Sequence, residues 1–283
     1  FAFSLIKMKG IKNIAIHKIT EADIVQKEDC IIEESPLQIV IEYGGENSRK
    51  QESLSVTMRT PGDDINLVAG FLFCEGVIQH AADILSIKHI GNEDDESAIM
   101  VAIAPHVYVD IESKKRNFVA AASCGFCGKT NADIISQQVF APLNKNFQIN
   151  TRQLYHLPEL LGTAQNFFTQ TGGSHAVALI NHNGELIHIS EDVGRHNAMD
   201  KLVGTMLGKN LLPLKEYIIL FSGRLGYELV QKSLISGIPV VCAIGAPSSL
   251  AIELAEKNGM TVIGFLKSKT FNIYCGAERI IQP

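Results

Sequence analysis

Apolar residues recur along the chain with two different periods, and the change of period divides it into two halves. In the first half they mostly alternate with polar residues, as in short β-strands that bury one face. Strands are predicted over residues 30–41, 53–60, 84–90, 98–104 and 107–112. One helix is predicted there; it starts at the turn 60–64 and its apolar stripe stops at Gly76. This half is predicted to be a small α+β unit.

The second half alternates apolar strands with helices. A helix is predicted over residues 151–169, broken or restarted at Pro158, and a hairpin around Asn183-Gly184 joins strands 176–180 and 185–189. Further strands are predicted over residues 217–221, 240–244 and 261–266, separated by a helix that ends at Gly237 and another over 250–258. Strand–helix alternation with short links predicts a parallel sheet with right-handed crossovers. The change from one pattern of predicted elements to the other places a domain boundary near residues 115–150.

Composition narrows the class of protein. The chain has 283 residues, of which 46% are hydrophobic, enough for one large domain or two ordinary ones. A net charge of −5 argues against a general nucleic-acid binder. No apolar run approaches the roughly 20 residues of a membrane span, so no membrane association is expected. Six scattered cysteines and opening residues unlike a secretory signal predict a reduced, cytoplasmic protein.

Two cysteines, Cys124 and Cys127, stand three apart with glycines between and after them and Lys129 close behind. This spacing suits a metal ligand pair, a dithiol redox centre or a sulfur-handling centre. Structural zinc needs further close ligands, and a thioredoxin-like site needs a different flank. The loop context favours a sulfur carrier whose thiolate holds sulfur as a persulfide. The other cysteines (Cys30, Cys74, Cys242 and Cys275) are predicted to be small buried hydrophobic residues.

Polar residues follow three predicted strands of the second half. Arg224 follows the first, Ser248 and Ser249 stand at the helix start after the second, and Lys267 and Lys269 follow the third. Ligands of open α/β sheets bind outside the carboxyl ends of strands, and helix starts with nearby cations suit phosphate. A phosphate-bearing ligand, such as a nucleotide, is one interpretation. The other is that the serines cap a helix and the lysines are solvated.

The segment from Glu191 to Lys201 concentrates charge before an apolar helical stripe. Arg195 is suited to bind phosphate or carboxylate, His196 to transfer protons, and Asn197 to contact a base edge. The alternative is a capped, charged first turn of a helix. His175, before a predicted strand, is a weaker candidate, because a lone histidine in this position more often has a structural role.

Taken together, these segments resemble the formate dehydrogenase accessory sulfurtransferase family (FdhD). The matching segments are Arg59-Thr60-Pro61-Gly62-Asp63, Gly70-Phe71-Leu72, Glu75-Gly76, Ser123-Cys124-Gly125-Phe126-Cys127-Gly128-Lys129, Thr171-Gly172-Gly173-Ser174-His175-Ala176, Glu191-Asp192-Val193-Gly194-Arg195-His196-Asn197-Ala198-Met199-Asp200-Lys201, Ser222-Gly223-Arg224, Pro247 with Leu250-Ala251, and Phe271-Asn272-Ile273-Tyr274. They run in order from Arg59 to about Ile280. The Glu191–Asn197 run together with the cysteine pair is highly specific, whereas the pair alone would not be.

The resemblance implies delivery of sulfur from a cysteine desulfurase to the bis-molybdopterin guanine dinucleotide cofactor of molybdenum or tungsten, which formate dehydrogenase requires. Cys124 would carry the persulfide, with Cys127 as its partner, and no catalytic metal of its own is expected. The implied cofactor-binding residues are Phe265, Leu266, Lys267, Ser268, Lys269 and Thr270, to which the strand-end analysis adds Arg195, His196, Asn197, Arg224 and Ser248. Arginines are common in the family's cofactor stretch; here Lys267 and Lys269 keep the charge without the bidentate geometry.

The resemblance also implies an architecture. An αβα, cytidine-deaminase-like domain is expected over residues 149–283, a smaller α+β domain over 1–119, and a mobile loop and linker over 120–148, usually in a homodimer. Two other functions remain open. One is a non-enzymatic cofactor chaperone or insertion scaffold. The other is a zinc deaminase, which is disfavoured because no proline precedes the cysteine pair and His188-Ile189-Ser190-Glu191 has the wrong spacing.

Overall fold

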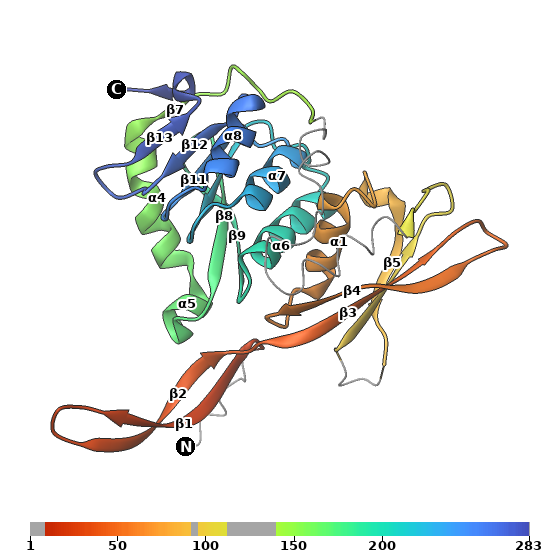
Figure 1. Cartoon of the computed structure of the whole chain (residues 1–283), viewed down its shortest axis with the longest axis horizontal. Helices are drawn as coiled ribbons and strands as arrows, with labels where there is room; N and C mark the ends of the chain where they lie inside the picture. Colours follow the sequence, from red (N-terminus) through yellow and green to blue (C-terminus); the bar gives the residue numbers. More distant parts are fainter. Residues whose placement is uncertain (1–8, 92–95, 112–139, 283) are drawn as a thin grey trace.

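The computed structural model of the chain describes residues 9–91, 96–111 and 140–282. Cys124, Cys127 and most of the predicted loop and linker lie outside the described residues, so the proposed domain limits stay predictions. A larger α/β body, a smaller sheet and a long hairpin arm make up the described chain (Figure 1). None of the described helices has the length and apolar character that crossing a bilayer requires.

The larger body is built on a six-stranded mixed sheet of order β13-β12-β11-β10-β8-β9. Its strands are β8 (His175–Asn181), β9 (Leu186–Asp192), β10 (Tyr217–Phe221), β11 (Val240–Ala243), β12 (Thr261–Gly264) and β13 (Asn272–Cys275). The parallel arrangement predicted for β10, β11 and β12 is confirmed. The flanking strands run antiparallel, and β8 with β9 forms the predicted hairpin.

Helices cover both faces of this sheet (Figure 1). Alternate strand residues such as Ile219 and Val241 pack in one core with α6 (Arg195–Gly208), α7 (Tyr227–Ile235) and α8 (Ser249–Lys257). Their neighbours, such as Ile218 and Val240, pack in another with α4 (Thr151–Ala164). The alternation of side chains along a strand separates the two cores.

Helix α4 corrects one prediction. It runs unbroken through Pro158 and ends at Ala164; Gln165 is its C-cap, and α5 (Asn166–Thr171) begins directly after it. The predicted break at Pro158 was wrong because Leu154, Leu157 and Leu161 bury one face of the helix against the sheet on both sides of the proline. That burial outweighs the lost backbone hydrogen bond.

The smaller sheet has the order β4-β3-β6-β5 and packs against one helix. Its strands are β3 (Ser35–Tyr43), β4 (Lys50–Arg59), β5 (Ile84–His89) and β6 (Ala98–Ile103), and its helix is α1 (Asp64–Cys74). The predicted pairing of β5 with β6 and the predicted helix are confirmed. The strand predicted over 107–112 was wrong, because residues 107–110 form no ladder and Ile111 turns into this core instead.

The hairpin arm consists of β1 (Ile11–Ile19) and β2 (Ile24–Ile32). It was not predicted, and residues 30–41, predicted as one strand, belong to β2 and β3 with a break at Glu33-Glu34. Apolar alternation marks strands that bury a face, whereas large apolar side chains of the arm, Ile19 and Ile24 among them, are exposed. Short elements complete the described structure: β7 (Ile149–Asn150) paired with β14 (Ile280–Ile281), and the 3₁₀ turns Ala81–Asp83 and Ala277–Arg279.

Two glycines join the small sheet to the larger body. A side chain at Gly70 on α1 would place its Cβ 1.9 Å from the backbone oxygen of Asp200 on α6. A side chain at Gly204 on α6 would meet the backbone oxygen of Asn66 at the same distance. The two helices therefore touch backbone to backbone, which only glycine allows.

The four described cysteines divide into two groups. Cys74 and Cys242 are buried as predicted. Cys30 and Cys275 are only partly buried, so the prediction was wrong for them. Cys30 lies on the arm, where no core covers it, and its thiol donates to Asn13 Oδ1 at 3.2 Å.

Candidate functional site

Several predicted binding residues meet at one edge of the six-stranded sheet, the carboxyl ends of β10, β11 and β12, whereas Cys124 and Cys127 lie outside the described residues. Arg224 follows β10, Ser248 precedes α8 after β11, and Phe265 follows β12. Strand β8 runs antiparallel to β10, so its first residue, His175, lies at the same edge and pairs with Asp192 at the end of β9. Helix α6 starts there with Arg195 and His196. We call His175, Arg195, His196, Arg224 and Phe265 the strand-end edge.

Backbone hydrogen bonds hold the loops of the strand-end edge together. The amide of Gly245 donates to the carbonyl of Gly223 at 3.1 Å, and the amide of Phe265 donates to the carbonyl of Gly245 at 3.0 Å. The imidazole of His175 lies against Gly223, where an added Cβ would come within 3.2 Å of Nδ1. The three loops and His175 therefore form one continuous surface.

Positive charge on the strand-end edge is left uncompensated by the described residues. Arg195 and Arg224 form no salt bridge there, and Arg224 is exposed. Lys267 and Lys269 are exposed just beyond Phe265. Cations in this setting attract anionic groups such as phosphate.

His196 is held neutral. Burial, and then the charges of Lys232 and Arg195, lower the pKa of His196 to about 3. Neither ring nitrogen has a hydrogen bond within the described structure, although Nε2 lies 3.4 Å from a carboxylate oxygen of Glu228. A pKa this low keeps the imidazole neutral and makes it a weak base, so the proton-transfer role of His196 stays a prediction.

Phe265 adopts a backbone conformation that is costly for its residue type. Its φ is +51°, in the left-handed region, and its ring is 43% exposed. Strain of this kind persists only where the surrounding structure enforces it, and it clusters at functional sites. Phe265 opens the stretch to Thr270 that the resemblance assigned to cofactor binding.

Ser248 caps α8. Its Oγ accepts the amide of Ala251 at 3.4 Å, so the capping interpretation is confirmed, while phosphate binding by Ser248 stays a prediction.

Asn197 and its neighbours instead join the two parts of the chain. The side-chain amide of Asn197 donates to Met58 O at 2.7 Å and to Asp192 Oδ1 at 3.0 Å, and its oxygen accepts the hydroxyl of Thr57. Asn197 therefore ties α6 to the end of β4.

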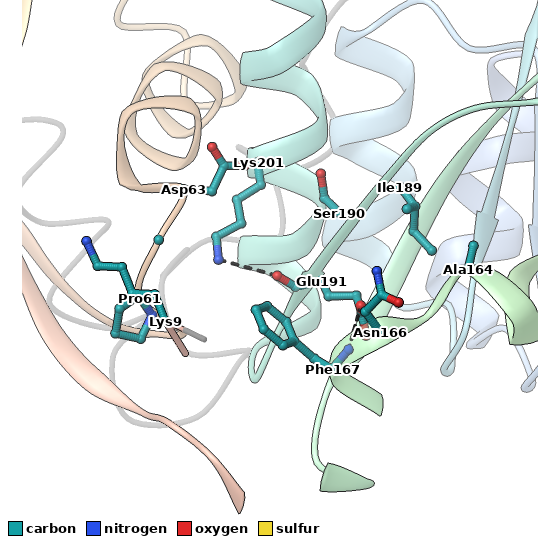
Figure 2. Close-up of a pocket in the computed structure, with 11 residues that line it drawn as sticks. Lys9, Pro61, Asp63, Ala164, Asn166, Phe167, Ile189, Ser190, Glu191 and Lys201 are labelled. Carbon is teal, nitrogen blue, oxygen red and sulfur yellow. Dashed lines mark hydrogen bonds between the residues drawn. The ribbon is translucent and has the colours of Figure 1, made fainter. Parts of the chain in front are cut away.

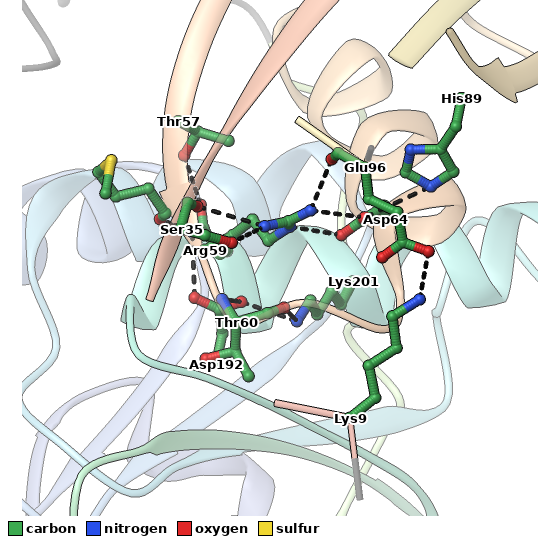
Figure 3. A network of polar contacts seen from close by, with 12 residues as sticks. Lys9, Ser35, Thr57, Arg59, Thr60, Asp64, His89, Glu96, Asp192 and Lys201 are labelled. Atoms are coloured by element: carbon green, nitrogen blue, oxygen red, sulfur yellow. Dashed lines mark hydrogen bonds and ion pairs between the residues drawn. The ribbon is translucent and has the colours of Figure 1, made fainter. Parts of the chain in front are cut away.

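Asp192 is fully buried between the same parts. Its two oxygens accept the amides of Thr60 at 3.0 Å and Gly194 at 2.8 Å, and its Oδ2 lies 2.7 Å from the ammonium of Lys201. Lys201 also donates to the carbonyl of Thr60 (Figure 3). A further hydrogen bond joins its ammonium to the carbonyl of Glu191. The charged segment is thus partly structural, a role the sequence left open.

Arg59 forms a second buried pair beside the first (Figure 3). Its guanidinium binds both oxygens of Asp64, at 2.7 and 2.9 Å, and donates to Ser35 and to the carbonyl of Glu96. This fork fixes the start of α1 against the small sheet.

Lys232 of α7 and Asp200 of α6 form a third buried pair, with Nζ 2.5 Å from both carboxylate oxygens. Burial alone would lower the pKa of Lys232, but the Asp200 carboxylate outweighs it and holds the pKa above its usual value. The Cys74 thiol of α1 bonds to Asp200, and burial raises the pKa of that thiol. Sequence reasoning missed this cluster because its members lie far apart in the chain.

Comparisons with known proteins agree with this picture. The FdhD/NarQ family model matches residues 32–281. A protein named sulfur carrier protein FdhD from Streptomyces coelicolor is 38% identical over 270 residues, covering 93% of each chain. One of the same name from Saccharolobus solfataricus is 39% identical over 270 residues, covering 95% of this chain and 98% of its own.

A solved structure shares the fold. It is described as a putative formate dehydrogenase accessory protein from Desulfotalea psychrophila, and it matches with a TM-score of 0.76 and 23% identity over 96% of this chain and all of its own. The family match, the relatives and the shared fold lead to one conclusion: the chain belongs to the FdhD/NarQ family.

Proposed function

We propose that this protein is a sulfur carrier that supports formate dehydrogenase. The observation that carries the proposal is the relationship to proteins named sulfur carrier protein FdhD over more than nine-tenths of the chain. The cationic strand-end edge supports it, because a carrier must dock an acceptor as well as hold sulfur.

Cys124 is the proposed sulfur-bearing residue. Its thiolate attacks the terminal sulfur of a persulfide on a cysteine desulfurase; a new S–S bond forms on Cys124, and the donor's own S–S bond breaks to release its cysteine thiolate. Lys129, five residues on, favours the thiolate form. Cys127 is the proposed partner in transfer or release.

The acceptor in this proposal is a molybdenum or tungsten bis-molybdopterin guanine dinucleotide, bound as cargo rather than as a resident cofactor. Arg195 and Arg224 would bind its phosphates, and the 265–270 stretch would hold its guanine nucleotide ends, with neutral His196 as a hydrogen-bonding group beside them. The cytidine-deaminase-like arrangement and the homodimer implied by the resemblance, and the cytoplasmic location predicted from the cysteines and the opening residues, belong to the same proposal.

Mass spectrometry after incubation with a cysteine desulfurase and cysteine tests the sulfur-carrying step. One added sulfur atom is expected on Cys124 in the wild type and in Cys127→Ala, and none in Cys124→Ala. Tris-phosphine reduction should remove it. Both thiols free after complete desulfurase turnover would contradict the carrier role; retained nucleotide binding in that case would favour the insertion scaffold.

A further inference from the structure

A cavity of about 310 Å³ lies beside the Lys201 side chain (Figure 2). Its walls come from the turn before α1, the end of β9 and the start of α5. The lining residues are Lys9, Pro61, Gly62, Asp63, Ala164, Asn166, Phe167, Ile189, Ser190, Glu191 and Lys201. Residues of two motif segments meet here, Pro61 to Asp63 from one and Glu191 with Lys201 from the other, and none of them has a role in the proposed sulfur transfer.

The cations of the cavity are already engaged. Lys201 Nζ has three partners, the carbonyls of Thr60 and Glu191 and the carboxylate of Asp192. Lys9 pairs with the carboxylate of Glu96 at the mouth. An anionic ligand would therefore find no free positive charge among the described lining residues.

The two carboxylates that line the cavity, Glu191 and Asp63, differ in how many hydrogen bonds they already accept. Glu191 accepts the amides of Phe167 and Phe168 at 2.9 and 3.0 Å and the hydroxyl of Ser174 at 2.7 Å, so both its oxygens are used. Asp63 is therefore the one carboxylate among the described lining residues that is available to a ligand. A single carboxylate supplies fewer oxygen ligands than Mg²⁺ or Ca²⁺ requires.

Asp63 stands where a helix-capping residue belongs, yet it does not cap. It is the N-cap of α1, but its side chain accepts no amide of the first turn. Its Oδ1 accepts a hydrogen bond from the side-chain Nδ2 of Asn66 at 2.7 Å, and no described cation forms a salt bridge with Asp63. Burial raises the pKa of this carboxyl. Asp63 is thus a partly desolvated carboxylate facing the cavity, and the charge of the lining cation that acts on it, Lys201, is already balanced by Asp192.

We propose that this cavity binds a small organic ammonium ion, with its charge on Asp63 and its carbon chain between Phe167 and Pro61. Figure 2 shows Asp63 and Pro61 on one side and the Phe167 ring extending toward them from the other. The Phe167 ring would pack against the carbon chain and attract its charged end. The volume is at the lower end for ligand pockets, which fits a ligand of a few heavy atoms.

Saturation-transfer NMR on the full chain tests this with three probes of one size: n-propylammonium, 1-propanol and propionate. Saturable binding is expected for propylammonium alone. Asp63→Asn, of the same shape, should weaken it at least about tenfold, since a charged hydrogen bond is lost. Phe167→Leu should weaken it about threefold. Glu21→Gln, at the exposed tip of the arm, is the control and should leave binding unchanged.

Thermal unfolding separates binding from folding. Asp63→Asn removes a desolvated charge, so its melting temperature should equal or exceed that of the wild type. No saturable propylammonium signal in the millimolar range, equal binding in Asp63→Asn, or propionate binding of similar strength would each overturn the proposal. None of these outcomes depends on persulfide formation, so the sulfur-carrier proposal is tested separately.

Discussion

The junction between the small sheet and the larger body differs from the strand-end edge in how charge is treated. At the junction Arg59, Asp192, Lys201, Asp200 and Lys232 are all buried, and each has an oppositely charged partner within 3 Å. At the strand-end edge Arg195 and Arg224 have no such partner in the described chain. Residues only a few positions apart therefore have different roles: Lys201 stabilises the junction, whereas Arg195 is available to a ligand.

This difference indicates which charged residues of a motif stabilise the fold and which are available to bind a ligand. A charged side chain that is buried must be paired, and its loss should reduce stability first. A charged side chain left unpaired at the ends of parallel strands contributes little to stability and is available to a ligand. The following substitutions test the distinction.

The largest effect is expected from Lys232→Met. It leaves Asp200 buried without a counter-charge, which should lower the free energy of unfolding by about 3–5 kcal/mol. Urea unfolding followed by circular dichroism measures it. The double variant Asp200→Leu, Lys232→Met removes both charges and should recover most of the loss. A single variant as stable as the wild type would show that the pair is not needed at the junction.

The second largest effect is expected from Gly204→Ala. It should lower the free energy of unfolding by about 2–3 kcal/mol, because the new methyl group overlaps the backbone of α1. Gly70→Ala should behave alike. The matched control is Gly162→Ala in α4, where nothing lies within 4 Å of the added methyl group; it should stabilise by about 0.5–1 kcal/mol. Equal effects at Gly204 and Gly162 would contradict the close helix contact.

Acid should destabilise the protein through His196. Its folded pKa of about 3 lies below the ordinary 6.5, so the unfolded chain takes up a proton that the folded chain does not. The stability that neutral His196 contributes is complete above pH 6.5 and is lost as the pH falls toward 3, with a slope of up to about 1.4 kcal/mol per pH unit. His196→Gln should flatten this part of the stability–pH curve, whereas His182→Gln, at an exposed turn, should not.

A smaller effect is expected at Phe265. Glycine adopts its left-handed conformation without strain and alanine does not, so Phe265→Gly should be more stable than Phe265→Ala by about 1 kcal/mol. Chemical denaturation of the two variants side by side measures the difference. If the ring binds a ligand, both variants should bind guanine nucleotide more weakly. Equal stability would mean that the backbone strain is absent in solution.

The sequence predicted those features that depend on local pattern. The stripe of α6, the buried strands β10 to β12 and the Asn183-Gly184 hairpin follow from periodicity and turn chemistry. The β1–β2 arm escaped prediction because its apolar residues stay exposed. Asp63 was recognised as a helix start but not as a cavity residue, since Phe167, which faces it, is a hundred positions away.

Binding of guanosine diphosphate is the most direct test of the strand-end edge. Calorimetric titration should show that Arg195→Ala and Arg224→Ala each weaken binding at least about tenfold, because each loses a charged contact with phosphate, while unfolding free energies change by less than about 0.5 kcal/mol. Arg152→Ala, exposed on the opposite face at the start of α4, should change neither quantity. Nucleotide affinity unaltered in both strand-end variants, or lost only together with the fold, would contradict the assignment of this edge to a phosphate-bearing ligand.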